Sequence, residues 1–202
     1  MGFYDQHVLP HVLDLAMRAD RLTPYRQRTI AQAEGRVLEI GVGSGVNLAF
    51  YSSRATELLA LDPHVKLLAM MRKQPTTVPV QALLGSAESI PVDTASVDTV
   101  VTTWTLCSIP HVVPALKEMR RVLKHSGRLL FVEHGLSRDP DVCRWQQRLT
   151  PLWRHIAGGC HLDRPIAQLI TAAGFRMETL DTNYAPGPRP FTFLYEGAAR
   201  PD

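Results

Sequence analysis

Glu39 is followed by three glycines at alternating positions, Gly41, Gly43 and Gly45. Glycines carry no Cβ atom, so the backbone can turn tightly and a ligand can lie against it and against a following helix N-terminus. The Glu39 carboxylate disfavours a pyrophosphate at this turn and favours a cationic group. A dinucleotide turn would also need its third glycine at the position of Val46. The pattern therefore indicates a site for a positively charged nucleotide.

A second acidic residue, Asp62, ends the next apolar stretch. A carboxylate at the end of this strand can accept hydrogen bonds from both hydroxyl groups of a ribose. S-adenosylmethionine combines a ribose with an ammonium and a sulfonium group, and its charges complement Glu39. The order of strand, Glu39, glycine turn, helix, strand and Asp62 predicts a site for this nucleotide. The alternative is an ordinary strand-to-helix turn with Asp62 as a surface acid.

Three histidines are candidates for acid–base chemistry: His111, His134 and His161. An unperturbed imidazole has a pKa of about 6.5, so at neutral pH it can accept a proton or hold an anion. His134 ends an expected strand at the edge where open α/β sheets bind ligands, with a purely structural histidine as the alternative. His161 follows a glycine pair that can fold over the pocket.

Apolar, sulfur-containing and basic side chains are expected to line the same edge. Thr103 falls at the carboxyl end of a strand and is assigned to the nucleotide site. The ring of Trp104 can form one side of an apolar pocket or make a cation–π contact. The alternative is a tryptophan packed in the core. For the other residues, packing is the alternative to a role in the pocket. The candidates for the pocket are Trp104, Cys107, Trp145, Cys160 and Arg164.

The elements that position these residues alternate between strand and helix. Short connections between them force parallel pairing through right-handed crossovers, which predicts a doubly wound α/β sheet. The expected strands cover 36–40, 58–61, 80–84, 98–103 and 128–133, and the expected helices start near Asn47 and cover 64–72 and 112–123.

The two ends of the chain complete this sheet. Residues 1–34 are expected to form a helical cap, with helices over 8–19 and 24–33. The spacing over 142–156 predicts a bent lid helix interrupted by Pro151. A helix over 165–173 and strands over 176–180 and 191–195 follow, and the last strand must run antiparallel to its neighbour. We expect one domain over 1–202, with seven strands, mostly parallel.

Composition narrows the partners. The 202 residues carry a net charge of +3 without a run of like charges, so no surface for nucleic acid is indicated. No apolar stretch has the roughly 18–20 residues that a membrane span needs, and Asp5, His7 and Pro10 stand where a signal peptide would be apolar. Three cysteines without a CxxC pair indicate neither disulfides nor zinc. We expect a cytoplasmic protein that holds no metal and binds small molecules; its oligomeric state is left open.

These motifs resemble those of the class I S-adenosylmethionine-dependent methyltransferases over nearly the whole chain. Besides the Glu39–Gly45 turn, the segment Gly85–Pro91 is similar to the family's segment along the adenine edge, and Val97–Val101 to its fourth strand. Most relatives have Asp where this chain has Ser86, so backbone groups would have to replace that acceptor. The resemblance implies a Rossmann-like fold and cofactor contacts from Asp62, Pro63, Ser86, Ala87 and Glu88.

Narrower motifs resemble the branch of this family that holds thiol S-methyltransferases. They are Trp104–Pro110, Val132–Gly135, Trp145–Gln147 and Gly158–Leu162. The same motifs are also similar to those of quinone C-methylases and phospholipid N-methylases, so these activities are alternatives. A cofactor-binding module without catalysis is a further alternative. A thiol near its pKa needs little help from a base, whereas a carbon or amine acceptor would make His134 or His111 essential. We expect transfer to sulfide or a small thiol by direct in-line displacement, mainly through positioning.

Overall fold

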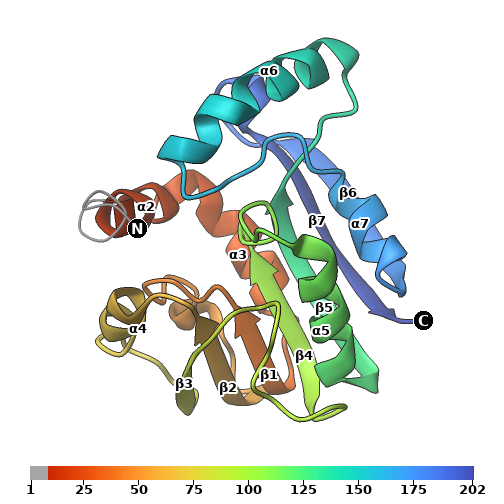
Figure 1. The fold of residues 1–202 in the computed structure, drawn as a ribbon. Coiled ribbons are helices and arrows are strands. Elements are labelled where there is room, and N and C mark those ends of the chain that lie inside the picture. Colours follow the sequence, from red (N-terminus) through yellow and green to blue (C-terminus); the bar gives the residue numbers. More distant parts are fainter. Residues whose placement is uncertain (1–8) are drawn as a thin grey trace.

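Seven strands form one sheet in the order β3-β2-β1-β4-β5-β7-β6 (Figure 1). This computed structural model describes residues 9–202. The first five strands pair in parallel, and β7 runs antiparallel to both β5 and β6. The expected α/β sheet with its antiparallel last strand is confirmed. The strands are β1 (Gly35–Ile40), β2 (Ala55–Asp62), β3 (Val80–Leu84), β4 (Val97–Thr103), β5 (Leu123–His134), β6 (Phe175–Tyr184) and β7 (Phe193–Pro201).

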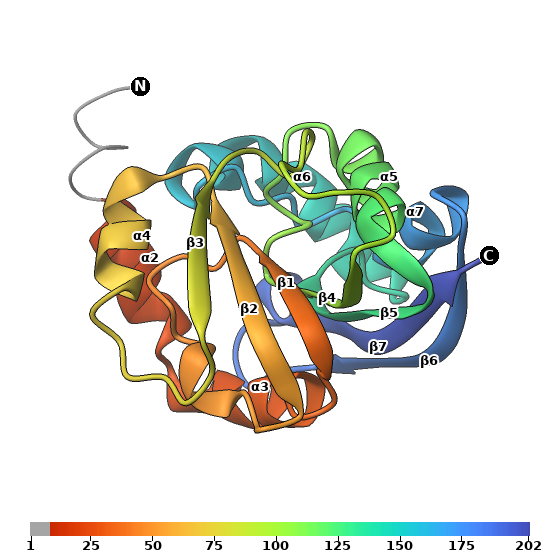
Figure 2. The ribbon, with the colours of Figure 1, turned by 90° about the horizontal axis from the view of Figure 1, so that it is seen from below.

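Helices cover both faces of the sheet (Figure 2). Alternate residues of a strand point to opposite faces, so neighbouring positions of β1 enter different cores. Leu38 and Ile40 pack with α5 and α7, whereas Val37 packs with Ile30 of α3 and with α4. The helices are α2 (Leu9–Met17), α3 (Thr23–Ile30), α4 (Val65–Met71), α5 (Val112–Val122), α6 (Pro140–Ile156) and α7 (Ile166–Ala172).

The helix expected near Asn47 is wrong. Residues Leu48–Phe50 form only a short 3-10 turn, after which the chain becomes extended at Tyr51. The Tyr51 side chain is buried, and its hydroxyl donates to the Glu39 carboxylate. This buried contact holds the chain extended at the point where a helix would have continued.

Several element boundaries also differ from expectation, and β5 and β7 show the largest differences. β5 begins at Leu123, which pairs with Val97, so this strand starts within the segment expected to be helix. Residues Arg189–Phe191 form a 3-10 turn, which moves the start of β7 to Phe193, and the strand then runs to Pro201. The expected first helix is found as α2, except that Val8 lies outside the described residues.

The expected lid helix is α6, which lies beyond the carboxyl ends of β4 and β5 (Figure 1). The side chain of Asp139 accepts from the backbone N–H groups of Asp141 and Val142 and so caps its N-terminus. The helix continues through Pro151 to Ile156. Among the described residues, no helix combines the length and apolar character that crossing a membrane requires.

Candidate functional site

The glycine turn between β1 and η2 (Leu48–Phe50) leaves open space at only one of its three glycines. All three have positive φ angles, of 69° at Gly41, 57° at Gly43 and 83° at Gly45. A Cβ atom at Gly41 would lie 2.5 Å from Thr105, and one at Gly45 would lie 2.9 Å from Met71. At Gly43 it would meet nothing closer than a backbone oxygen at 4.0 Å. Gly41 and Gly45 therefore serve packing, and Gly43 leaves room for a ligand.

Glu39 lies at the end of β1, buried beneath this turn. Its Oε1 accepts from the Asn47 amide at 2.7 Å, and its Oε2 accepts from the Tyr51 hydroxyl at 2.8 Å. The Asn47 side chain in turn accepts from Arg26 of α3, which is also buried. Burial raises the pKa of Glu39 to about 7, and its two hydrogen bonds and Arg26 only partly oppose this. A cation that reaches Glu39 would favour its charged form.

Asp62 at the end of β2 holds the same turn from the neighbouring strand. Its Oδ2 accepts from the backbone N–H of Gly43 at 3.0 Å, and its Oδ1 accepts from that of His64 at 2.8 Å. The side chain is only 5% exposed. Nδ1 of the His64 ring also lies 3.1 Å from Oδ1, so of the roughly four acceptor positions of a carboxylate about one remains for a ribose hydroxyl. Pro63 follows on the exposed surface.

Helix α2 reaches the turn from the other side. The carboxylate of Asp14 accepts a hydrogen bond from the Ser44 hydroxyl. Asp14 also pairs with Arg18 one helical turn further on, at 3.0 Å. The N-terminal helix therefore contacts the glycine turn directly, at the residue after Gly43.

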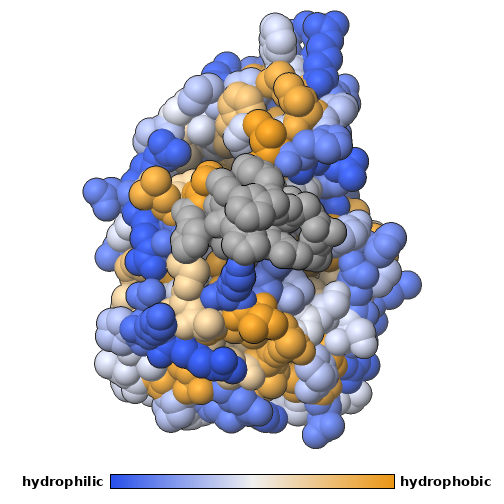
Figure 3. Space-filling view, turned by 60° about the vertical axis from the view of Figure 1, so that its left-hand side comes forward, coloured by the Kyte–Doolittle hydropathy of each residue, from blue (hydrophilic) through white to orange (hydrophobic). Residues whose placement is uncertain are grey.

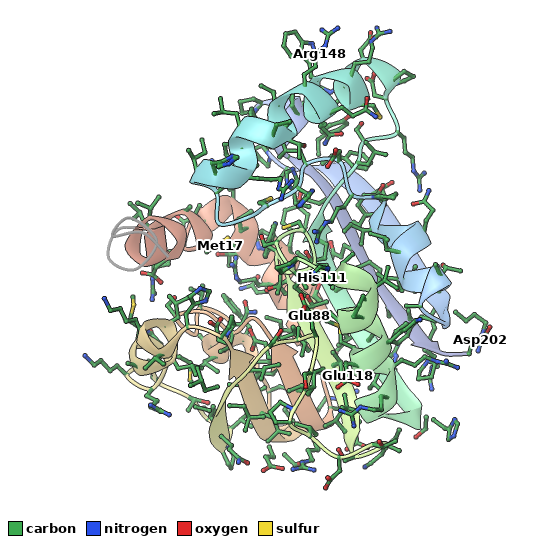
Figure 4. The ribbon with its side chains drawn as sticks, viewed as in Figure 1. Met17, Glu88, His111, Glu118, Arg148 and Asp202 are labelled. Carbon is green, nitrogen blue, oxygen red and sulfur yellow. The ribbon has the colours of Figure 1, made fainter. Side chains whose placement is uncertain are left out.

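The segment after β3 connects the nucleotide edge to α5. The Ser86 hydroxyl accepts from the backbone N–H of Glu88, and Ala87 is buried. The Glu88 carboxylate accepts from the backbone N–H of His111 at 3.0 Å, and Figure 4 shows these two residues side by side. The His111 side chain is exposed just before α5. Glu88 thus ties the expected adenine segment to the loop after β4.

Trp104 follows β4 with a backbone φ angle of +49°, a conformation that residues other than glycine rarely adopt. Its ring lies under the guanidinium of Arg26, which is 4.6 Å from the ring centroid. Thr103 accepts from the Asn47 amide at 2.9 Å. Backbone strain of this kind persists where the surroundings enforce it and is concentrated at functional sites. One ring face of Trp104 is occupied by the Arg26 guanidinium, and the residue as a whole is half-buried.

The loop 104–107 is held from below by Glu133, the penultimate residue of β5. Its Oε1 accepts from the Thr102 hydroxyl at 2.7 Å and from the backbone N–H of Thr105 at 3.1 Å. Oε2 is buried and has no hydrogen-bond partner among the described residues. Burial raises the pKa of Glu133 to about 7. Arg164 donates to the carbonyl of Leu106 and is itself buried, so it braces this loop.

Three of the predicted site residues meet above β5. Cys160 Sγ lies 3.5 Å from Cys107 Sγ and 3.5 Å from Nδ1 of His134. Nε2 of His134 is buried and has no partner among the described residues. His161 lies next to this group, and its backbone N–H donates to the Cys107 carbonyl at 2.8 Å. The pKa of its imidazole is lowered by burial first and then by Arg164.

Trp145 is placed away from this group. Its side chain is 55% exposed on α6, in one stripe with Leu152 and Ile156, which are also exposed. Figure 3 shows apolar side chains gathered at the α6 end of the molecule. Figure 4 places Arg148 on the outer side of the same helix. The structure therefore brings Cys107, Cys160 and Arg164 to the pocket edge but leaves Trp145 at the surface.

A recess of about 580 Å³ opens elsewhere, between α5 and the C-terminal residues. Its lining includes Arg120, Leu123 and Asp202, so it lies where β5 begins. Open α/β sheets bind their ligands at the carboxyl ends of the strands. The edge with Glu39, Asp62 and His134 therefore remains the candidate site.

Sequence reasoning missed four residues of this site: Arg26, Asn47, Tyr51 and Glu133. Asn47 and Tyr51 lie 8 and 12 positions after Glu39, and nothing but proximity to the glycine turn could have indicated them. Glu133 precedes His134 at the end of an apolar strand, where a buried acid is unusual, and that was a usable signal. Arg26 carried none, because its contact with Asn47 joins residues 21 positions apart.

The turn, its open glycine and the two strand-end carboxylates define a nucleotide-binding α/β protein whose ligand is cationic. A family model described as "Methyltransferase domain" matches residues 38–131. Thiol S-methyltransferase TMT1B of Rattus norvegicus is 32% identical over 170 residues, which cover 81% of this chain and 68% of that protein. Thiol S-methyltransferase TMT1A of Homo sapiens is 30% identical over 159 residues, 74% of this chain and 64% of that protein.

A solved structure from Leishmania major, described as a SAM-dependent methyltransferase, has a TM-score of 0.73 and 17% identity. The match covers 98% of this chain and 80% of that one. The chain belongs to the S-adenosylmethionine-dependent methyltransferases, and S-adenosylmethionine is its cofactor. The turn has open space at Gly43, and the backbone N–H of this glycine donates to the acidic side chain of Asp62, which suits a ligand with a ribose and positive charge.

Proposed function

We propose that this methyltransferase transfers the methyl group to sulfide or small thiols. The observation that carries the proposal is the pocket edge above β5, where His134 and two cysteines meet and Nε2 of His134 is buried without a partner. The relatives named as thiol S-methyltransferases support it over 74–81% of this chain. In the described contacts Nδ1 of His134 faces Cys160 and not a carboxylate of the kind that orients the basic histidine in a Ser-His-Asp triad.

The cofactor supplies an activated methyl carbon, and the chain's residues place it. We assign the amino-acid end to the Glu39 side of the turn, the ribose to Asp62, and the adenine to the segment of Ser86, Ala87 and Glu88. Gly43, whose N–H donates to Asp62, leaves open space on the turn for this ligand. Asn47 and Arg26 keep Glu39 aligned and partly compensate its charge before the cofactor binds. Orientation of this kind accounts for much of the rate in a direct displacement.

The acceptor side needs only modest chemistry for a thiol. The thiolate is the nucleophile, and a free thiol with a pKa of about 8.5 already supplies some of it at neutral pH. His134 is assigned to hold the acceptor sulfur and to accept its proton through Nε2. Trp104 is assigned to form a wall of the acceptor site, with its ring held against Arg26. Glu133 and Arg164 keep the 104–107 loop in place and act as positioning residues.

The test is product identification with isotopically methyl-labelled cofactor. The full chain is incubated with sulfide, several small thiols, a quinone and a phospholipid headgroup amine in separate reactions. We expect the label on sulfur, with S-adenosylhomocysteine formed in equal amount. Label on carbon or nitrogen alone would overturn the thiol assignment. Cofactor binding by calorimetry without turnover of any acceptor would indicate a binding module instead.

A matched pair of variants localises the chemistry. Glu39→Gln removes the charge under the turn but keeps the side chain's shape, so it should weaken cofactor binding. Glu57→Gln changes a half-exposed acid on the adjoining strand that pairs with Arg36, and it should leave binding unchanged. Equal effects of both variants would remove Glu39 from the cofactor site.

A further inference from the structure

Two cysteines from segments 53 positions apart lie side by side at the acceptor edge. Their sulfur atoms are 3.5 Å apart. Cys107 is buried with 2% exposure, whereas Cys160 is partly exposed. The third cysteine, Cys143, lies on α6, and its thiol contacts the carbonyl of Ser137 instead. The chain therefore contains one close pair of thiols, in which Cys160 is the more exposed member, together with a separate single thiol.

The backbone keeps this pair together. The N–H of His161 donates to the Cys107 carbonyl at 2.8 Å, and a Cβ atom on Gly159 would lie 3.2 Å from the Ser108 carbonyl. Gly158 and Gly159 have positive φ angles of 59° and 84°. A disulfide needs sulfur atoms about 2.0 Å apart, so the two sulfurs must approach by roughly 1.5 Å. The glycine pair provides a place where the chain can absorb a shift of that size.

The surroundings make the two thiols unequal. The neighbouring Cys107 thiol lowers the pKa of Cys160, against the effect of desolvation, and His134 adds to this lowering. The pKa of Cys107 is raised, first by Cys160 and then by burial. A thiolate is the attacking species in exchange with a disulfide, so the more exposed Cys160 is suited to attack and Cys107 to follow. The described residues offer no grouping of three or more His, Cys, Asp or Glu side chains suited to a metal ion.

We propose that Cys160 and Cys107 form a redox-active dithiol that reduces low-molecular-weight disulfides at the acceptor edge. Neither methyl transfer nor the identity of its acceptor is part of this reaction. The proposal rests on three observations: the two sulfur atoms lie close together, Cys160 is partly exposed, and Gly158 and Gly159 precede it.

The reaction runs in two exchange steps. The Cys160 thiolate attacks one sulfur of the small disulfide, the bond between its two sulfurs breaks, and the first thiolate leaves and takes up the proton that Cys160 had lost. Cys107 then gives up its proton and attacks the Cys160 sulfur. The Cys107–Cys160 bond forms, and the second small thiol leaves with that proton. The two cysteines are oxidised, and the small disulfide is reduced to two thiols.

Oxidation would also change the site. The new bond would join the 104–107 loop, which Glu133 and Arg164 brace, to the segment that ends at His161. The two small thiols would be released at the edge assigned above to the acceptor. The reduced and oxidised forms should therefore differ in methyl transfer, although this difference is not needed for the exchange reaction itself.

The experiment uses the full chain, reduced and freed of reductant, with hydroxyethyl disulfide as the probe and no cofactor. After quenching in acid, free thiols are alkylated, and mass spectrometry maps each cysteine. We expect the wild-type protein to lose two hydrogens and to contain a Cys107–Cys160 disulfide, with Cys143 alkylated. Cys107→Ser should instead accumulate the mixed disulfide on Cys160, and Cys160→Ser should form neither product. Cys143→Ser, the matched control, should behave as the wild type.

The wild-type map decides the proposal even where a variant fails to fold. A stable mixed disulfide on Cys160 without closure would show that Cys107 does not reach it, and would overturn the proposal. So would an adduct on Cys143 alone or the absence of reaction. The exchange experiment contains no cofactor, so a negative result there does not bear on the proposed methylation of thiols. A negative result in the methylation assay likewise does not bear on the proposed disulfide exchange.

Discussion

Two glutamates, Glu39 and Glu133, occupy equivalent places on the sheet but differ in their hydrogen-bond partners. Glu39 lies near the end of β1 and Glu133 near the end of β5, both are fully buried, and burial raises the pKa of each to about 7. Both oxygens of Glu39 accept hydrogen bonds, and the buried cation of Arg26 is linked to Glu39 by two successive hydrogen bonds through Asn47. Among the described residues, Oε1 of Glu133 accepts from two donors and Oε2 has no partner at hydrogen-bond distance, and the backbone N–H groups of Leu106 and Cys107 add to the stabilisation of its charged form.

The difference separates binding from support. Glu39 lies under a turn whose middle glycine faces open space, so a cationic ligand can complete its environment. Glu133 lies under a loop that it shapes itself, and its donors come from that loop and from β4. Burial alone therefore does not identify a ligand-binding acid. A ligand-binding acid is identified by the open space next to it and by which segments supply its hydrogen-bond donors.

The largest expected effect is on cofactor affinity and tests the assignment of the Glu39 turn to cofactor binding. Gly43→Val should abolish cofactor binding, with at least a roughly 100-fold loss in affinity, which is about 2.7 kcal/mol. The valine would fill the space beside Asp62 and would have to adopt a φ angle near +57°. Calorimetric titration with S-adenosylhomocysteine measures the change.

Backbone strain needs its own control, because any side chain at positive φ costs about 1–2 kcal/mol. Gly187→Val introduces the same residue at a φ angle of 139°, in the turn before β7. It should lower the melting temperature and leave cofactor affinity unchanged. Retained affinity in Gly43→Val would remove the turn from the cofactor site.

The cofactor side was predictable because it is encoded locally. Glu39 and the three glycines fall within seven consecutive residues, and Asp62 ends the next strand, so regular spacing alone placed them at one edge. The alternation of elements likewise predicted the sheet and its antiparallel last strand. The helix expected at Asn47 failed because a buried tyrosine–glutamate contact overrides local propensity there.

The acceptor side was only partly predictable because three distant segments build it. Cys107, His134 and Cys160 were each candidates from the sequence, but their mutual contacts depend on how α6 returns the chain to the sheet. Trp145 shows the limit most clearly. Its helical spacing could not say which face of α6 packs inward, and its side chain is exposed.

The second prediction addresses the supporting glutamate. Glu133→Ala removes the acceptor of the Thr102 hydroxyl and the Thr105 N–H, so the free energy of unfolding should fall by about 2 kcal/mol. Glu133→Gln keeps an acceptor oxygen and should stay close to the wild type. Denaturant unfolding measures both variants. Undiminished stability of Glu133→Ala would show that the loop does not depend on this carboxylate.

The third prediction sharpens the comparison through pH. The pKa of Glu39 in the free protein is about 7, and a bound cation favours the ionised form, so cofactor binding should release a proton below that pH. Affinity should therefore rise with pH, by up to roughly tenfold per unit, between about pH 5.5 and about pH 7. The ammonium group of the cofactor, with a pKa near 8, keeps its charge over this range.

Two variants assign that pH dependence to one carboxylate. Glu39→Gln should bind weakly and with a flat profile, whereas Glu133→Gln should keep the wild-type slope. Calorimetry in buffers of different ionisation enthalpy counts the released protons directly. A slope that survives in Glu39→Gln would assign the proton to another group.

The smallest effect distinguishes the histidines at the acceptor side. His134→Ala should lower kcat/KM for a thiol by about tenfold, below the 10²–10⁴-fold that general-base catalysis typically contributes, because a thiol needs little help with its proton. His111→Ala should change kcat/KM less than about twofold, since its exposed ring lies outside the group around Cys160 and only its backbone N–H holds Glu88. A loss above about 100-fold in His134→Ala would indicate a strong base and so favour a carbon or amine acceptor. A larger loss for His111→Ala than for His134→Ala would place the acceptor near α5 and away from the two cysteines.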